Sequence, residues 1–159
     1  MGKEPISIRK DTASKIIKAS VENVYHVFLN ADAVAEWRPP AGMRCHIYSF
    51  DPKEGGIYRM AFEYTNKGHR IKGKTSASAD VFTGQFVKLE KNKKIVESVT
   101  FESDDPAYAE AMIITTTLIP VDGGTEVTFT VTHVPAVIKP EDHYKGMMST
   151  LDNLAMYTE

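Results

Sequence analysis

The segment GHRIKGKT, Gly68 to Thr75, has the residue types and spacing of a phosphate-binding loop, G-x-x-x-x-G-K-[ST]. In a working loop of this kind, backbone amides and a helix N-terminus hold the phosphates, and the lysine reaches the outer ones. That chemistry needs a buried strand before the loop and a helix after it. The residues before the match alternate like an amphipathic antiparallel strand, and the following SASADVFTG shows no helical stripe. We therefore interpret the match as a coincidence.

The residues around this match, 65 to 79, are locally basic. A solvated loop is the simplest interpretation of such a charge run, and binding of an acidic ligand or partner surface is the alternative. The residues concerned are Lys67, His69, Arg70, Lys72 and Lys74.

Two other polar residues have positions suited to proton transfer. Glu97 shares strand parity with Val99, and His133 shares it with Val131, so both side chains are expected to point inward. A buried carboxylate must be paired or protonated, and either residue could then act as a general acid or base. The structural alternatives are a strand bulge that places Glu97 in solvent or near a basic side chain, and a hydrogen-bonded structural role for His133.

The sequence shows no motif for metal binding or nucleophilic catalysis, and we expect neither a metal nor a cofactor. The single cysteine, Cys45, allows no internal disulfide and no cysteine-based zinc site. There is no nucleophile elbow G-x-S-x-G. The five histidines show no H-x-x-x-H or H-x-H spacing; they are His26, His46, His69, His133 and His143.

The composition is that of a globular protein. The chain has 159 residues, of which 42% are hydrophobic and 25% charged, and its formal net charge is −2. This length suits one domain, 1–159, and the charge gives no general attraction to nucleic acid. No window approaches the roughly 18 apolar residues of a membrane span, and the N-terminus lacks the hydrophobic run of a signal peptide. A cytoplasmic protein is therefore expected.

Elements that would position the candidate residues begin with a strand and two short helices. Residues 6–18 predict a strand that ends near Ile17. Apolar residues spaced at i, i+3, i+4 and i+7 over 21–28 predict a helix with Ser20 as its N-cap. Asp32 is expected to cap a second helix, ADAVAEW, which must end before Pro39.

From Met43 onward the hydrophobic pattern changes to period two, which predicts strands. The connecting turns are too short for crossover helices, so the strands should pair antiparallel. The predicted strands are 43–50, 57–64, 80–90, 95–103, 112–121 and 125–134.

The C-terminal residues 139–159 predict the most amphipathic helix of the chain. Pro140 fits its first position, and Glu141 and Asp142 suit the positive end of the helix dipole. This helix should lie across the sheet, which makes the fold class α+β. The apolar stripe consists of Tyr144, Met147, Met148, Leu151, Leu154 and Ala155.

Several motifs occur in a fixed order along these elements. Trp37 closes the second helix and is followed by Pro39 and Gly42. D-x-x-x-G-G enters a strand at 51–56, Gly84 lies in the strand before KIVESVTF, and G-G-T precedes an alternating strand at 123–125. The terminal helix has the pattern His143, Gly146, Met147, Leu151, Leu154. In this order the chain resembles the SRPBCC or START-like superfamily, and within it the family of the activator of the ninety-kilodalton heat-shock protein's ATPase.

The resemblance extends from about residue 12 to the end of the chain and implies a helix-grip fold. In this fold a curved antiparallel sheet wraps around a long C-terminal helix, with two short helices after the first strand, and a largely apolar cavity lies between sheet and helix. The chain departs from the family pattern in two ways: Met147 stands where members often have Trp, and the strand has no aromatic residue at position 97 or 98, which are Glu97 and Ser98. Relatives bind lipids, sterols, polyketides or plant hormones, some cyclise or hydrolyse, and one branch stimulates a chaperone.

One face of each strand, with the terminal helix, would line this cavity. Filling of an ordinary core is the alternative for each residue. Arg44, Arg59 and Tyr58 could orient a polar group of a ligand. The candidate ligand-binding residues are Phe28, Trp37, Tyr58, Met60, Phe62, Glu97, Val99, Phe101, Met112, Ile114, Thr116, Leu118, Phe129, Val131, His133, Met147, Met148 and Leu151.

Three functions follow from these residues and the resemblance. The first is binding of a small hydrophobic molecule in the cavity, which apolar side chains and flexible methionines suit. The second is a cyclase, aldolase or hydrolase in which Glu97, His133 or a tyrosine transfers protons. The third is an interaction module that docks a chaperone through the basic loop. The sequence also leaves a homodimer open.

Overall fold

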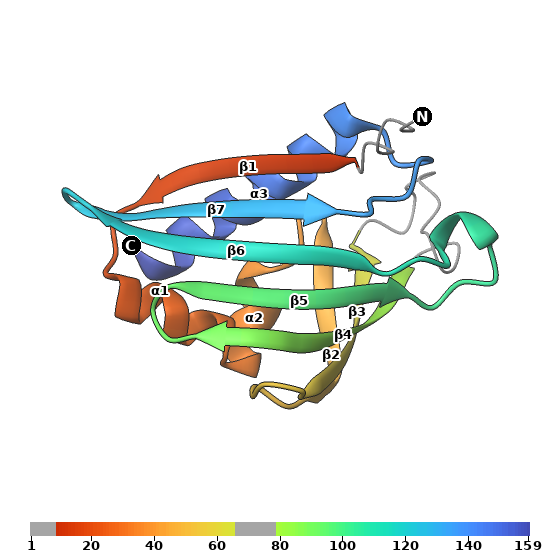
Figure 1. Ribbon diagram of the computed structural model, residues 1–159, viewed down its shortest axis with the longest axis horizontal. Helices are drawn as coiled ribbons and strands as arrows, with labels where there is room; N and C mark the ends of the chain where they lie inside the picture. The colour runs from red at the N-terminus through yellow and green to blue at the C-terminus, as the bar shows by residue number, and fades with distance from the viewer. Residues whose placement is uncertain (1–8, 66–78) are drawn as a thin grey trace, which may run out of the picture.

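The sheet and the long C-terminal helix form two layers, as the computed structural model of residues 9–65 and 79–159 shows (Figure 1). The fold is α+β, a seven-stranded antiparallel sheet curved around α3, so the helix-grip prediction is confirmed. The elements in chain order are β1 (Lys10–Ile17), α1 (Val21–Phe28), α2 (Ala31–Trp37), β2 (Met43–Phe50), β3 (Ile57–Tyr64), β4 (Ala79–Glu90), β5 (Lys94–Phe101), the 3-10 turn η1 (Pro106–Tyr108), β6 (Met112–Val121), β7 (Gly124–Thr132) and α3 (Pro140–Thr158).

The strands lie in the order β1-β7-β6-β5-β4-β3-β2, so β2 to β7 form a meander and β1 adds to its far edge. All neighbouring strands pair antiparallel, as the short turns predict. The register shifts between Ile47 and Ser49 in β2 and between Phe86 and Lys88 in β4. Such bulges bend a strand and increase its twist, and here they accompany the curvature of the sheet around α3.

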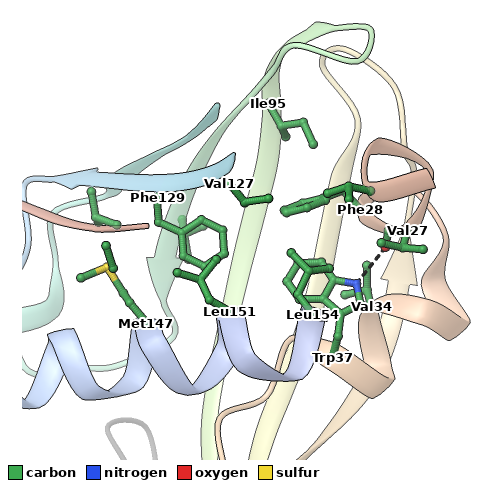
Figure 2. Packing of buried hydrophobic residues seen from close by; sticks show 14 of the residues in the cluster. Val27, Phe28, Val34, Trp37, Ile95, Val127, Phe129, Met147, Leu151 and Leu154 are labelled. Atoms are coloured by element: carbon green, nitrogen blue, oxygen red, sulfur yellow. Dashed lines mark hydrogen bonds between the residues drawn. The ribbon is translucent and has the colours of Figure 1, made fainter. Parts of the chain in front are cut away.

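The core lies between the sheet and α3. In β7, alternate residues from Thr125 to Val131 are buried, which is the period-two pattern of a strand with one covered face. Met147, Leu151 and Leu154 point from α3 toward Val127 and Phe129 of β7 (Figure 2). Tyr144 was expected in this stripe but is 51% exposed, because the buried face of α3 centres on Met147 and Leu151.

The two short helices cover one end of these layers and contact α3 (Figure 1). Ser20 caps α1 as predicted, since its side chain accepts a hydrogen bond from the Asn23 amide. The cap of α2 is Asn30 and not Asp32, which lies in the first turn of the helix. Trp37 donates its indole N–H to the Val27 carbonyl over 2.9 Å, which joins the two helices (Figure 2).

The phosphate-loop match at 68–75 and the basic side chains from Lys67 to Lys74 lie outside the described residues. The strands on either side, β3 and β4, are antiparallel neighbours, whereas a phosphate-binding loop connects a strand to a helix. Among the helices that the structure describes, none is both long and apolar enough to cross a membrane.

Candidate functional site

A cavity of about 710 Å³ lies between the concave face of the sheet and α3. The wall of the cavity is mostly apolar, and it includes the end of α2 and the segment that follows α2. Twelve of the residues that the sequence predicts as ligand-binding line it: Phe28, Trp37, Phe62, Glu97, Val99, Phe101, Met112, Ile114, Thr116, Phe129, Val131 and Met147.

Six predicted residues do not line the cavity, and five of these lie in or against the core. Met60, Leu118 and Leu151 are buried in the surrounding core, and Met148 is half-buried against it. Strand and helix parity identifies the covered face, but it does not show where along that face the side chains meet and where they leave space. Tyr58 also lies in the core, but its hydroxyl reaches toward the cavity wall.

The expectation that His133 points into the cavity is wrong. β7 ends at Thr132, and His133 has a φ of 61°, a left-handed backbone conformation that ends the alternation of the strand. Its imidazole lies 3.9 Å from Glu110 and beside a separate surface pocket of about 380 Å³. Glu97 and His133 therefore do not form a common site.

Glu97 instead belongs to a buried polar cluster with Arg38 and Tyr58, here called the Arg38–Glu97–Tyr58 cluster. Arg38 Nη1 donates to Glu97 Oε1 over 2.8 Å, and the Tyr58 hydroxyl donates to the same oxygen over 2.6 Å. Arg38 Nη2 also donates to the Tyr58 oxygen over 3.2 Å. Glu97 is only 1% exposed, so its charge is balanced inside the protein by the guanidinium.

Gly84 allows Tyr58 to reach Glu97 from two strands away. Tyr58 is directly opposite Gly84 in the β3–β4 pair, and Glu97 lies on β5, beyond β4. A Cβ atom at Gly84 would lie 2.1 Å from Tyr58 Cζ, closer than nonbonded atoms approach. The missing side chain therefore leaves the space in which the tyrosine ring crosses β4.

Arg38 is positioned by polar side chains of α3. Pro39 and Pro40 follow it and have no backbone N–H, so this segment cannot continue α2. Thr150 donates to the Arg38 carbonyl over 3.0 Å, and Asn153 donates to the Pro39 carbonyl over 2.8 Å. The backbone that presents the guanidinium is thus held on the helix across the cavity.

Burial and charge have opposite effects on the Arg38 guanidinium. Burial lowers its pKa, but the carboxylate of Glu97 and the phenol of Tyr58 raise it, and the net pKa lies above its usual value. Burial also raises the pKa of the Tyr58 phenol well above 10, so the phenol is neutral near pH 7. The cluster therefore presents an ion pair with little net charge to the cavity.

Sequence reasoning did not identify Arg38. The inward parity of Glu97 could have indicated it, because a buried carboxylate requires a cationic partner and few Lys or Arg residues are predicted near the cavity. The two arginines that the sequence suggested could orient a ligand, Arg44 and Arg59, lie elsewhere. Arg44 is exposed and pairs with Glu63, and Arg59 pairs with Glu102 on the outer face of the sheet.

Thr116 on β6 is another polar residue of the cavity wall, which also includes Asp80, Asp142, His143, Lys145, Ser149 and Thr150. Its side chain is fully buried, and its hydroxyl has no hydrogen-bond partner within residues 9–65 and 79–159. A buried hydroxyl without a partner costs free energy, so this position differs from ordinary core threonines.

At the start of α3, His143 lines the cavity and contacts β1. Its Nδ1 lies 2.7 Å from Asp11 Oδ2. Arg9 donates to both oxygens of Asp11, over 3.1 and 2.8 Å. The hydrogen bond from Arg9 holds the pKa of Asp11 below its usual value of 3.8 against the opposing effect of burial, and the hydrogen bond with His143 contributes further.

Asp11→Asn is expected to lower the free energy of unfolding at neutral pH by about 1–3 kcal/mol, because Arg9 and His143 lose the carboxylate to which they are hydrogen-bonded. Since the pKa of Asp11 is lower in the folded state, its contribution is present above 3.8 and is lost as the pH falls through the folded-state value. Urea unfolding at several pH values should therefore show a smaller acid-induced loss in the variant. Asp152→Asn, which removes an exposed partner of Lys15, is the control. Equal acid-induced losses in wild type and Asp11→Asn would contradict this role.

Within the described ranges no three His, Cys, Asp or Glu side chains gather in a way that could hold a metal ion. Burial raises the pKa of the Cys45 thiol to about 11, although the charge of Arg38 lowers it. Cys45 is therefore protonated near neutral pH and is a poor nucleophile.

Comparison with known proteins agrees with this geometry. The structure is similar to the crystal structures of a Chromobacterium violaceum protein (29% identity, 94% of this chain and 96% of that chain covered, TM-score 0.82) and a Rhodobacter sphaeroides protein (17% identity, 94% and 95% covered, TM-score 0.73). It is also similar to the solution structure of an AHSA1-like protein from Aeromonas hydrophila (18% identity, 94% and 91% covered, TM-score 0.68). No curated protein matches the chain significantly. The family model described as activator of Hsp90 ATPase homolog 1-like protein matches residues 18–159, so the chain belongs to this family, as its sequence motifs predict.

Proposed function

We propose that this protein binds a small hydrophobic molecule in the cavity between the sheet and α3. The observation that supports this most directly is the cavity of about 710 Å³, which has the size of known small-molecule sites. Interiors that serve only stability are close-packed and leave few voids larger than a water molecule. A space of this size, beside a core whose other side chains are fully buried, therefore suggests a ligand.

The chemistry of the wall favours binding over catalysis. Glu97 Oε1 is bound by both Arg38 and Tyr58, and the raised pKa of Tyr58 keeps its phenol protonated. The second acid or base expected from the sequence, His133, lies outside the cavity. The enzyme hypothesis required at least two of Glu97, His133 and a tyrosine to converge. Glu97 and Tyr58 do so, but they are hydrogen-bonded to each other and Glu97 is paired with Arg38, so this pair supports a structural cluster better than proton transfer to a substrate. The chaperone hypothesis depended on the basic segment at 67–74, which lies outside the described residues.

The uncharged fluorescent probe N-phenyl-1-naphthylamine tests the proposal. We expect one molecule to bind the wild-type protein with an increase in its fluorescence. Ile114→Trp places a larger side chain in the cavity wall and should weaken binding roughly tenfold or more, since the indole would occupy space that the probe needs. Ile119→Trp makes the same change at a half-exposed position on the opposite face of β6 and should leave binding unchanged.

Native mass spectrometry of the purified protein complements this titration. A reproducible extra mass, present in the native spectrum and absent from the denatured one, would be the molecule acquired from the host. Ile114→Trp should lose that mass and Ile119→Trp should keep it. A wild-type protein that binds neither the probe nor any host molecule would contradict the proposed function.

A further inference from the structure

The unpaired hydroxyl of Thr116 indicates what kind of polar group the ligand has. The side chain lines the cavity and is fully buried, and its oxygen lacks a partner in the described part of the chain. Buried polar groups are normally hydrogen-bonded, so an unmatched one in a cavity wall identifies a position where a ligand atom can form the missing bond.

Glu97 offers a second unmatched atom nearby. Both hydrogen bonds to its carboxylate end on Oε1, and Oε2 forms none with the residues that the structure describes. Thr116 pairs with Ile95 in the β5–β6 register, and Glu97 lies two residues farther along β5 on the same face. Diagonal neighbours of this kind have their Cα atoms roughly 7–8 Å apart, close enough for one ligand group to contact both side chains.

These two atoms have complementary requirements. Glu97 Oε2 accepts a hydrogen bond, and the Thr116 hydroxyl can donate one. A ligand hydroxyl satisfies both, because it donates its hydrogen to Glu97 and accepts from Thr116. A ketone or ether oxygen can only accept, so it leaves Glu97 Oε2 unmatched.

The Arg38–Glu97 ion pair disfavours an ionised ligand group at this position. Arg38 already balances Glu97. A ligand carboxylate would place a second negative charge beside Glu97, and an ammonium group would add a second positive charge beside Arg38. Either would leave a net buried charge, which is costly.

We therefore propose that the ligand is an uncharged hydrophobic alcohol whose hydroxyl group lies between Thr116 and Glu97. This inference rests on the proposed binding function and specifies the ligand class for that cavity.

Displacement of N-phenyl-1-naphthylamine by a matched series of ten- and eleven-carbon compounds tests it. We expect 1-decanol to compete best. The ketone 2-undecanone should compete about fivefold more weakly, because it loses one hydrogen bond, and decanoate and decylammonium should compete more weakly still. Thr116→Val, which has nearly the same shape, should weaken 1-decanol binding about fivefold more than it weakens binding of the probe, which has no hydroxyl group.

Thr125→Val is the matched control, since Thr125 is equally buried but donates its hydroxyl to the Ala19 carbonyl over 2.7 Å, away from the cavity wall. It should lose thermal stability and keep its affinity for 1-decanol. Thr116→Val should lose no thermal stability, because it removes only an unpaired group.

The outcomes separate the two proposals. If the probe binds but decanoate competes as well as 1-decanol, or Thr116→Val binds 1-decanol like wild type, the alcohol inference is overturned and the binding function stands. If wild type binds neither the probe nor any host molecule, both proposals are overturned.

Discussion

Arg38→Met is expected to lower the free energy of unfolding by about 3–5 kcal/mol, because it leaves the buried carboxylate of Glu97 without its counter-ion. Met retains most of the aliphatic stem of arginine and lacks the guanidinium, so most of the change is the loss of the ion pair and its hydrogen bonds. Urea unfolding, followed by the fluorescence of Trp37, the single tryptophan, measures the effect.

A second substitution separates loss of charge balance from loss of packing. Arg38→Met combined with Glu97→Gln removes both charges, and we expect it to recover much of the lost stability. Arg59→Met is the control on the other side of the sheet, where the guanidinium pairs with exposed Glu102. That variant should remain close to wild type, because exposed ion pairs contribute little. Equal effects of Arg38→Met and Arg59→Met would contradict the buried role of Arg38.

Gly84→Ala is expected to destabilise the protein by about 2–4 kcal/mol, which is large for the addition of one methyl group. The new Cβ atom would overlap the ring of Tyr58, so the tyrosine must move and its hydrogen bond to Glu97 is lost. The backbone conformation of Gly84 is not left-handed, so the effect comes from the ring and not from backbone strain. Chemical unfolding again provides the measurement.

Variants of Tyr58 test whether the ring causes this effect. In a Tyr58→Ala background, Gly84→Ala should cost little, whereas in a Tyr58→Phe background the overlap persists and most of the cost should remain. Gly146→Ala, in the middle of α3 with open space around it, should instead be neutral or stabilising by about 0.5–1 kcal/mol, since alanine favours helix. Additive effects of Gly84→Ala and Tyr58→Ala would show that the two residues act independently.

Sequence patterns located the elements of this fold well because their signals are local. Period-two alternation identified the strands after Met43, and the spacing of apolar residues identified α1 and α3. The prediction of the N-cap of α2 was wrong because two nearby residues are both able to cap a helix. Asn30 and Asp32 are both good N-caps, and Asn30, which immediately precedes the first turn of α2, accepts the hydrogen bond.

Parity also predicted which residues of each strand face α3, and it identified Glu97 as an inward carboxylate. It misjudged His133, because alternation applies only while the backbone stays extended, and the left-handed φ at His133 ends it. It also could not show that Met60 and Leu151 fill the core while Ile114 and Thr116 border a cavity. That difference depends on how closely the two layers approach at each point.

The sequence by itself determined the fold class, the order of the elements and the family, because hydrophobic periodicity and turn residues are local features of consecutive residues. Only the tertiary structure decided the composition of the site. Arg38, Tyr58 and Glu97 come from a helix end and two nonadjacent strands, and they meet because Gly84 lacks a side chain and α3 holds the segment after α2. Contacts between residues distant in sequence follow from the packing of whole elements, which no local pattern records.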